Sequence, residues 1–354
     1  MSDKYNWIRN VALGADNSFS AILLRSLLRL LSPVYRLVVG IRNWAFDKRI
    51  LPIRKVPAPV ISIGNLTVGG TGKTPMVIWL AEKIQSNHQV AIVSRGYGAK
   101  AGRLNDEGLE IAHRLDDVVQ MQDRNRFLAA QQAIERIGNE RRPVILLDDG
   151  FQHRKLHRDL NIVLVDATNP FGNGRLIPGG LLREPITSIR RAQVAVLTRS
   201  DQVDPDCAKK IKRQLLQLNP DLIWAEAATV VCGLRDSIGQ VVDQEAVQGK
   251  QVVAFCGIGN PAGFEFSLQQ HGVECAELVT FPDHHDFTES DLQKLVAKAK
   301  ELHCSYAVCT GKDMVKIQSL SSTDSQIPVL ALTTEIAFLI GEQELLAAVE
   351  RTIA

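Results

Sequence analysis

The sequence predicts an α/β fold, in which a parallel sheet is covered by helices and is followed by a second, smaller α/β unit. Short runs of Val, Ile and Leu recur along the chain, and helix-like stretches lie between some of them. Strands that are apolar on both faces and alternate with helices form parallel sheets buried on both sides. The chain has 354 residues, of which 45% are hydrophobic and 23% charged, so it can form roughly two domains with large cores. This composition excludes a disordered tail, a coiled coil and a small disulfide-stabilised scaffold.

The predicted elements fall into two series. In the first, strands are expected at Val60–Ile63, Val90–Val93, Val144–Leu147, Ile162–Val165 and Val194–Leu197, with helices at Met76–Gln85, Arg126–Ile137 and Cys207–Leu218. After a break at Asn219-Pro220, the second has strands at Thr229–Val231, Val252–Cys256, Ala307–Cys309 and Val329–Leu332. We therefore expect a basic N-terminal segment at 1–50, a first domain at 51–225 and a smaller α/β domain at 226–354.

The N-terminal segment combines positive charge with apolar residues. Residues 1–50 contain eight Lys/Arg and three Asp/Glu, although the whole chain carries a net charge of only +2. This asymmetry indicates that one end meets an anionic surface, and a nucleic-acid partner would need a broader basic footprint. Ser18–Phe46 holds four arginines and no acid. On a helix, Arg25, Arg29 and Arg36 would lie within about 40° of one another.

Two interpretations of this segment remain open. It could form an interfacial helix that buries apolar residues among acyl chains, or a helix packed on the protein's own core with arginines at its edge. Pro33 is expected to kink or divide the helix. A membrane-spanning helix is not expected, because the longest uncharged run, Val56–Gly72, is 17 residues long and contains two prolines and four glycines.

The strongest motif is the segment VISIGNLTVGGTGKTP, residues 60–75. It reads as a strand, a glycine-rich turn, a Gly-Lys-Thr sequence and the start of a helix with an early proline. Such a turn directs backbone N–H groups toward phosphate oxygens, and the helix N-terminus adds positive charge. A nucleotide-binding P-loop is therefore predicted, with Thr67 where the motif usually begins with glycine. Its expected phosphate-binding residues are Thr67, Val68, Gly69, Gly70, Thr71, Gly72, Lys73 and Thr74.

A P-loop of this kind is usually accompanied by an acidic residue at the end of another strand, which helps to bind Mg²⁺. The segment PVILLDD, residues 143–149, ends in Asp148 and Asp149. Together with the Thr74 hydroxyl, these carboxylates predict a Mg²⁺ site. The chain is thus expected to have a P-loop NTPase-type first domain that binds ATP and Mg²⁺.

Five ordered motifs give this chain a specific resemblance. They are GNLTVGGTGKTP, SRGYG at 94–98, LDDGFQH at 147–153, FGNGRLIPGGLLREP at 171–185 and FPDHHDFT at 281–288. Together they resemble the tetraacyldisaccharide 4'-kinase (lipid A 4'-kinase) family over essentially the whole chain. The resemblance implies transfer of phosphate from ATP to the 4'-hydroxyl of tetraacyldisaccharide 1-phosphate, giving lipid IVA. It implies a peripheral location on the cytoplasmic face of the bacterial inner membrane, with an anionic membrane surface and a membrane-embedded acceptor as partners, and no obligate protein partner.

The resemblance also implies residue roles. Asp106, with Glu107 beside it, takes the place of the family's proposed base, and His284 that of its histidine partner; the adjacent His285 competes with His284 for this role. Arg183 is expected near the phosphates and Glu184 as a metal ligand. Tyr97, Gln152 and His153 are candidate substrate contacts. A lipid-borne acceptor gives the N-terminal helix a purpose and favours the interfacial interpretation.

Other classes of P-loop protein fit less well. A membrane-recruited regulatory ATPase would need a lysine before the paired glycines, where Val68 stands. A ligase acting on a soluble metabolite would leave the basic apolar N-terminus without a purpose. An interaction module with an inactive P-loop conflicts with the presence of Lys73, Thr74 and the acid pair.

Overall fold

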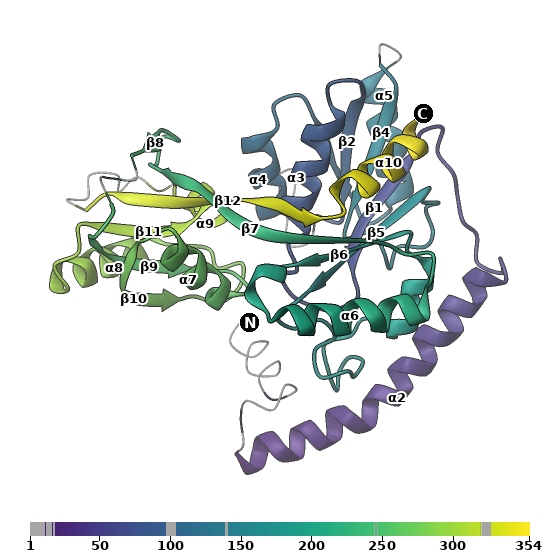
Figure 1. The fold of residues 1–354 in the computed structure, drawn as a ribbon, viewed down its shortest axis with the longest axis horizontal. Helices are drawn as coiled ribbons and strands as arrows, with labels where there is room; N and C mark the ends of the chain where they lie inside the picture. Colours follow the sequence, from purple (N-terminus) through teal and green to yellow (C-terminus); the bar gives the residue numbers. More distant parts are fainter. Residues whose placement is uncertain are drawn as a thin grey trace.

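A computed structural model describes residues 11, 16, 18–96, 104–138, 141–243, 245, 247–318, 320 and 327–354. It shows two lobes of unequal size, joined by two long strands, and a long helix that extends along one side of the larger lobe (Figure 1). One continuous, mostly parallel sheet runs through both lobes in the order β10-β9-β11-β12-β7-β6-β5-β1-β4-β2-β3, with β8 paired to β7. The predicted α/β class is confirmed.

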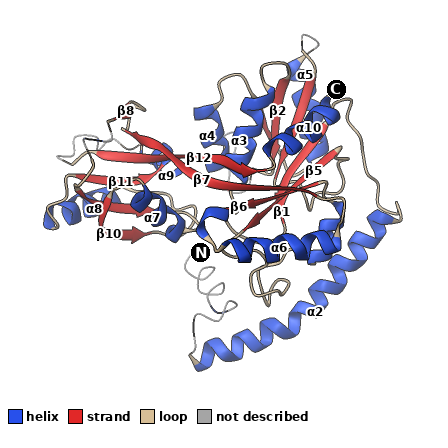
Figure 2. Ribbon diagram, viewed as in Figure 1, coloured by secondary structure: helices blue, strands red, loops and turns tan. Residues whose placement is uncertain are grey.

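The larger lobe contains the first series of elements. Its strands are β1 (Val60–Asn65), β2 (Gln89–Ser94), β3 (Val119–Gln122), β4 (Pro143–Asp148), β5 (Leu160–Asp166) and β6 (Val194–Thr198). Its helices are α2 (Phe19–Asp47), α3 (Lys73–Ile84), α4 (Asp106–Arg114), α5 (Arg126–Ile137) and α6 (Pro205–Leu218), with the 3-10 turns η1 (Ile186–Arg191) and η2 (Ser200–Gln202). Helices lie on both faces of the sheet (Figure 2), so strands such as β1 and β4 are buried on both sides.

The smaller lobe contains β8 (Val241–Val242), β9 (Gln251–Cys256), β10 (Glu274–Thr280) and β11 (Tyr306–Thr310). Its helices are α7 (Pro261–Gln270), α8 (Glu289–Glu301) and α9 (Gly311–Ile317). Two apolar clusters fill it, one around Phe255 and Leu295 and the other around Phe264 and Leu268.

Two long antiparallel strands, β7 (Ile223–Arg235) and β12 (Val329–Ile340), connect the lobes. The expected boundary after residue 225 falls inside β7. After β12 the chain returns to the larger lobe, where α10 (Glu342–Ile353) buries Leu345 and Val349 in the same core as α3. The C-terminal helix therefore forms part of the core of the larger lobe.

Helix α2 begins at the Ser18 cap, whose hydroxyl accepts a hydrogen bond from the Ala21 N–H. It continues through Pro33, so of the two expected effects of this proline, a kink or a division, the division is wrong. Contacts on both sides of the proline hold the helix against the lobe: Ser32 donates to the Leu176 carbonyl at 2.8 Å, and Tyr35 donates to the Arg183 carbonyl at 3.0 Å. These contacts offset the helical hydrogen bond that proline cannot make.

Candidate active site

The P-loop lies between β1 and α3, at the carboxyl end of the sheet. Gly69 and Gly72 have φ values of +127° and +85°, which glycine adopts far more readily than other residues. The Asn65 amide donates to the Thr71 hydroxyl at 2.8 Å, and the Thr198 hydroxyl donates to the Thr71 carbonyl at 3.1 Å. Side chains at the ends of β1 and β6, which lie on either side of β5, therefore hold the turn that precedes Lys73.

The first half of the loop is paired like a strand, which accounts for its departure from the usual motif. Thr67 forms an antiparallel bridge with Leu182, and the Val68 N–H donates to the Leu181 carbonyl at 2.8 Å. A β-branched residue suits extended backbone of this kind. Thr67 therefore lies in an extended, paired segment, where the glycine with which the motif usually begins is not required.

Three charged side chains meet beside the P-loop. Lys73 Nζ is 3.8 Å from Asp149 Oδ1, and Arg183 Nη1 donates to both Asp149 oxygens at 2.8 and 2.7 Å. Burial alone would raise the pKa of Asp149, but the charges of Lys73 and Arg183 outweigh it and lower that pKa. Asp149 also has φ +51°, a conformation that is uncommon outside glycine and that marks functional sites.

Asp148, at the end of β4, has the opposite electrostatic character. It is buried, and its Oδ1 atom has no hydrogen-bond partner among the described residues. Burial, followed by the charge of Asp149, raises the pKa of Asp148 to about 7. An unsatisfied buried carboxylate oxygen next to the phosphate loop fits a divalent cation, which would supply the missing partner.

These residues fit Mg²⁺ better than a metal held only by protein. Within the described ranges, no group of three His, Cys, Asp or Glu side chains is arranged to bind a metal. Mg²⁺ typically takes one or two carboxylates, a hydroxyl, substrate phosphates and waters. Thr74, Asp148 and Asp149 provide the protein part of such a set.

Glu184 has a different role from the one expected, because both of its oxygens are already engaged. The side chain is fully buried, and it forms ion pairs with Arg42 of α2 and with Arg191. Asn43 lies within hydrogen-bond distance at 3.4 Å. The expectation of a metal ligand at this position is corrected: Glu184 fixes α2 to the lobe, while its neighbour Arg183 contacts Asp149 beside the P-loop.

Asp106 and His284 meet across the two lobes. Asp106 is the first residue of α4, capped by Asn105, whose side chain accepts from the Gly108 N–H at 3.0 Å. His284 Nδ1 is 3.0 Å from Asp106 Oδ2. The backbone at His284 has φ +62°, and its N–H donates to the Gly257 carbonyl at 3.1 Å. The structure brings together the two residues that the motifs predict to act as a pair.

His285 faces away from Asp106. Its Nε2 atom is 3.1 Å from Asp291 Oδ2, and its ring stacks on Phe281 and contacts the edge of Phe287. These contacts hold the loop that carries His284. Of the two candidate histidines, only His284 is placed against Asp106.

Two lysines of α9 complete this cluster, and nothing in the sequence motifs pointed to them. Lys316 Nζ is 2.7 Å from Asp106 Oδ2, and Lys312 Nζ is 3.3 Å from Glu107 Oε1. Burial raises the pKa of Asp106, but hydrogen bonds from His284 and Lys316 and the charges of Lys316 and Lys312 lower it to about 2. In the sequence, the only sign of these lysines is their spacing of four residues, which places them on one face of a short helix. That spacing does not indicate a site until the fold shows which residues the helix contacts.

The remaining candidate substrate contacts are Gln152, His153 and Tyr97, and the structure describes only the first two. Gln152 donates to the Asn65 carbonyl at 2.8 Å, directly behind the P-loop. Burial and nearby cations, Arg126 foremost, lower the pKa of His153 to about 4, so this histidine is neutral near pH 7. Arg126, which the sequence did not single out, is buried at the start of α5 and interacts electrostatically with both aspartates at the end of β4. Tyr97 lies outside the described residues.

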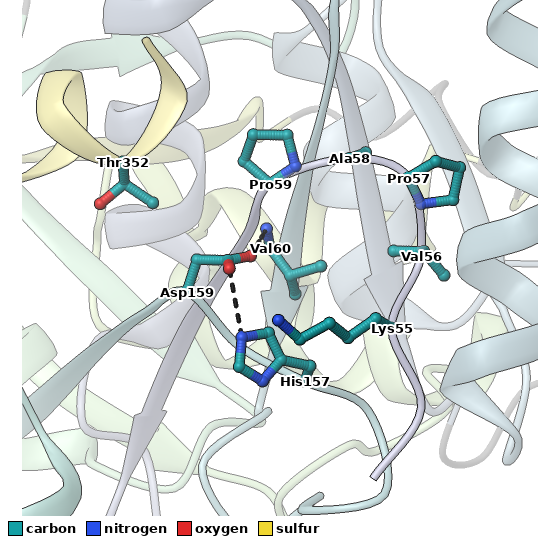
Figure 3. Close-up of a pocket in the computed structure, with 9 residues that line it drawn as sticks. All are labelled: Lys55, Val56, Pro57, Ala58, Pro59, Val60, His157, Asp159 and Thr352. Atoms are coloured by element: carbon teal, nitrogen blue, oxygen red, sulfur yellow. Dashed lines mark hydrogen bonds and ion pairs between the residues drawn. The ribbon is translucent and has the colours of Figure 1, made fainter.

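A separate cavity of about 330 Å³ lies away from this site (Figure 3). It is lined by Lys55, Val60, His157 and Asp159 among others. Val60 is the first residue of β1, whereas the P-loop follows the last, so the cavity is at the opposite end of that strand. His157 and Asp159 pair with each other across 3.2 Å.

The sheet, the P-loop, the acid pair and the cross-lobe Asp–His pair define a P-loop phosphotransferase. A family model described as tetraacyldisaccharide-1-P 4'-kinase matches residues 24–354. The chain belongs to this family, as its motifs predict.

Individual relatives agree with the family model. The chain is 33% identical to a tetraacyldisaccharide 4'-kinase of Halothermothrix orenii over 339 residues, covering 88% of each chain. It is 35% identical to that of Geobacter sulfurreducens over 329 residues, covering 88% of this chain and 89% of the relative. Among solved structures, LpxK from Aquifex aeolicus in complex with ATP matches with a TM-score of 0.73 and 32% identity, over 94% of this chain and 100% of that chain.

Proposed function

We propose that this chain transfers the γ-phosphoryl group of ATP to the 4'-hydroxyl of a membrane-embedded tetraacyldisaccharide 1-phosphate, the lipid A precursor. The single observation that carries the catalytic part is the contact of His284 of the smaller lobe with Asp106 of α4, a helix that packs against the helix of the P-loop, α3. The reaction takes place on the cytoplasmic face of the bacterial inner membrane, where α2 holds the enzyme as a peripheral protein.

The larger lobe binds the phosphates. Backbone N–H groups of the P-loop surround them, Lys73 reaches the β- and γ-phosphates, and Arg183 approaches from the segment paired with the loop. Thr74, Asp148 and Asp149 would hold Mg²⁺, which when bound neutralises charge on the β- and γ-phosphates. Lys73 and Arg183 already contact Asp149, so the same residues order the site before the nucleotide binds.

The acceptor hydroxyl is activated by Asp106 and His284, where the two lobes meet. Phosphoryl transfer passes through a loose transition state, in which the attacking oxygen needs alignment and a late proton acceptor more than a strong base. Asp106 is ionised near pH 7 and serves as that acceptor, while His284 orients its carboxylate. Glu107 is beside them, hydrogen bonded through Oε2 to Asn105 at 2.7 Å.

Helix α2 presents its apolar side to the outside of the molecule. Leu23, Leu30, Leu37 and Ile41 are 56–74% exposed and lie within about 40° of one another on the helix, whereas Ala21, Val39 and Phe46 face the protein. A large exposed apolar stripe on a basic helix is typical of in-plane membrane binding. In the described part of the chain, no helix is long and apolar enough to cross a membrane.

The test is transfer of radiolabelled γ-phosphate from ATP to tetraacyldisaccharide 1-phosphate in detergent micelles. The wild-type protein should phosphorylate the lipid, and Asp106→Ala should lose about 10²-fold or more in kcat while it still binds ATP. ATP hydrolysis without a phosphorylated lipid would instead identify a regulatory ATPase. Wild-type turnover in a folded Asp106→Ala protein would remove Asp106 as the proton acceptor.

A further inference from the structure

Lys316 lies at the centre of the contact between α4 and α9. Its side chain is 8% exposed, which is unusual for a lysine unless it is paired. Its ammonium group binds Asp106 Oδ2 at 2.7 Å and donates to the His285 carbonyl at 3.0 Å. One group therefore ties the carboxylate of the larger lobe to the backbone next to His284 in the smaller lobe.

We propose that Lys316 is a positioning residue for phosphoryl transfer: it fixes one oxygen of Asp106 and keeps the carboxylate ionised, so that the other oxygen faces the acceptor hydroxyl. The inference rests on the proposed function, since it assigns Lys316 a part in the same proton transfer. It also extends the catalytic pair to a triad in which two groups from the smaller lobe hold one carboxylate of the larger lobe.

The geometry gives the two carboxylate oxygens different tasks. Both His284 and Lys316 contact Oδ2, and no residue in the described ranges donates a hydrogen bond to Oδ1. In the transfer, the acceptor O–H bond breaks as its oxygen bonds to the γ-phosphorus. The bond from that phosphorus to the bridging oxygen breaks, and the electron pair leaves with ADP. The proton goes to Asp106 Oδ1.

The charges around Asp106 show why Lys316 matters more than its neighbours. Helix α9 contributes Lys312 and Lys316, the loop contributes Asp283 and His284, and α4 itself contributes Glu107. Glu107 is neutralised by Lys312, which leaves Lys316 as the cation in direct contact with Asp106. Without Lys316, burial of the carboxylate would no longer be opposed by a bonded positive charge, and the protonated form would become more favourable.

The experiment measures kcat and kcat/KM for lipid phosphorylation between pH 3 and 9 in the wild type, Lys316→Met and Lys316→Arg. The acidic limb of the wild type should lie at or below the lower end of this range, because the pKa of Asp106 is about 2. Lys316→Met should move this limb to higher pH by about two units, into the range. Its kcat should fall about tenfold at pH 8 and further below about pH 5, while the KM for ATP stays within about twofold. Lys316→Arg keeps the charge, so it should retain the wild-type acidic limb and recover part of kcat.

Two further lysine variants serve as comparisons. Lys298→Met removes an exposed ion pair with Glu277 in the same lobe and should leave the profile unchanged. Lys312→Met removes a more distant charge and should shift the limb less than Lys316→Met.

The outcomes separate the two proposals. If wild-type protein makes no phosphorylated lipid, the proposed function fails. If the wild type is active but Lys316→Met keeps the wild-type acidic limb, the positioning role is wrong, whatever happens to kcat. Should Lys316→Met fail to fold by thermal unfolding, Lys316→Arg decides: an acidic limb shifted upward despite the retained charge overturns the proposal.

Discussion

Arg42 of α2 and Glu184 form an ion pair in which the carboxylate is fully buried and the guanidinium is 36% exposed, with Arg191 bound to the other oxygen of the same carboxylate. Glu184→Ala would leave Arg191 buried without its main partner. Removing one member of a buried pair typically costs about 3–5 kcal/mol of folding free energy. Urea unfolding should therefore show a lower midpoint, and ATP affinity in Mg²⁺ should change little in the folded fraction. Normal stability with a specific loss of Mg²⁺ dependence would restore the metal-ligand interpretation.

Lys73→Ala should abolish most lipid phosphorylation, because we propose that the lysine contacts phosphate oxygens whose charge must be stabilised in the transition state. We expect a loss of about 10²-fold or more in kcat, measured by γ-phosphate transfer. Lys83→Ala is a suitable control, since Lys83 is at the end of the same helix and forms an exposed pair with Glu342. Comparable losses in both variants would indicate damage to α3 rather than loss of a phosphate contact.

The Asp106 carboxylate should make folding stability depend on pH in a defined direction. Its pKa in the folded protein is about 2, below the ordinary value of 3.8, so the ionised form stabilises the fold above about pH 4. This contribution, about 1–2 kcal/mol after allowance for solvent, is lost as the pH falls toward 2. The difference in unfolding free energy between wild type and Asp106→Asn should therefore shrink between pH 5 and 2.5. A constant difference over this range would mean that the carboxylate is not held as described.

The exposed stripe of α2 should govern binding to vesicles. Leu30 and Leu37 are 74% and 63% exposed and lie two turns apart, so replacing both by Glu should leave the fold intact. Sedimentation with anionic liposomes should fall about tenfold or more, because two apolar side chains no longer enter the acyl region. Ile238→Glu, at an equally exposed position in the smaller lobe, should bind like the wild type. Equal losses in the two proteins would contradict the assignment to α2.

The sequence predicted the parts of the fold that local pattern determines. Strands such as β1 and β4 are continuous apolar runs, and the P-loop has its own glycine spacing, so both were found with small errors in their ends. The extent of β7 was missed, because only its middle was expected and its exposure alternates where it leaves the larger lobe. The strand β10 was missed for a similar reason, since most of its residues are only half-buried.

Residues of the candidate site were predicted when they belong to a recognisable motif. They were missed when only the packing of distant segments brings them to the site. Asp106 and His284 are 178 positions apart and were paired only through the family resemblance. Lys316 belongs to no motif, and its role depends on how α9 packs against α4. Glu184 was assigned to the metal through the family resemblance, but its burial among arginines of α2 and η1 could not be predicted from the sequence.

Two side chains of α2 contact consecutive residues: Tyr35 donates a hydrogen bond to the Arg183 carbonyl, and Arg42 forms an ion pair with the Glu184 carboxylate. The Arg183 side chain in turn forms an ion pair with Asp149. Helix α2, which we propose to lie on the bilayer, is thus connected to the carboxylate beside the P-loop through two adjacent residues. If α2 lies on the lipid surface as proposed, a tilt of the helix would act directly on Arg183, so the way in which the enzyme lies on its membrane would also affect how the groups beside the P-loop are aligned.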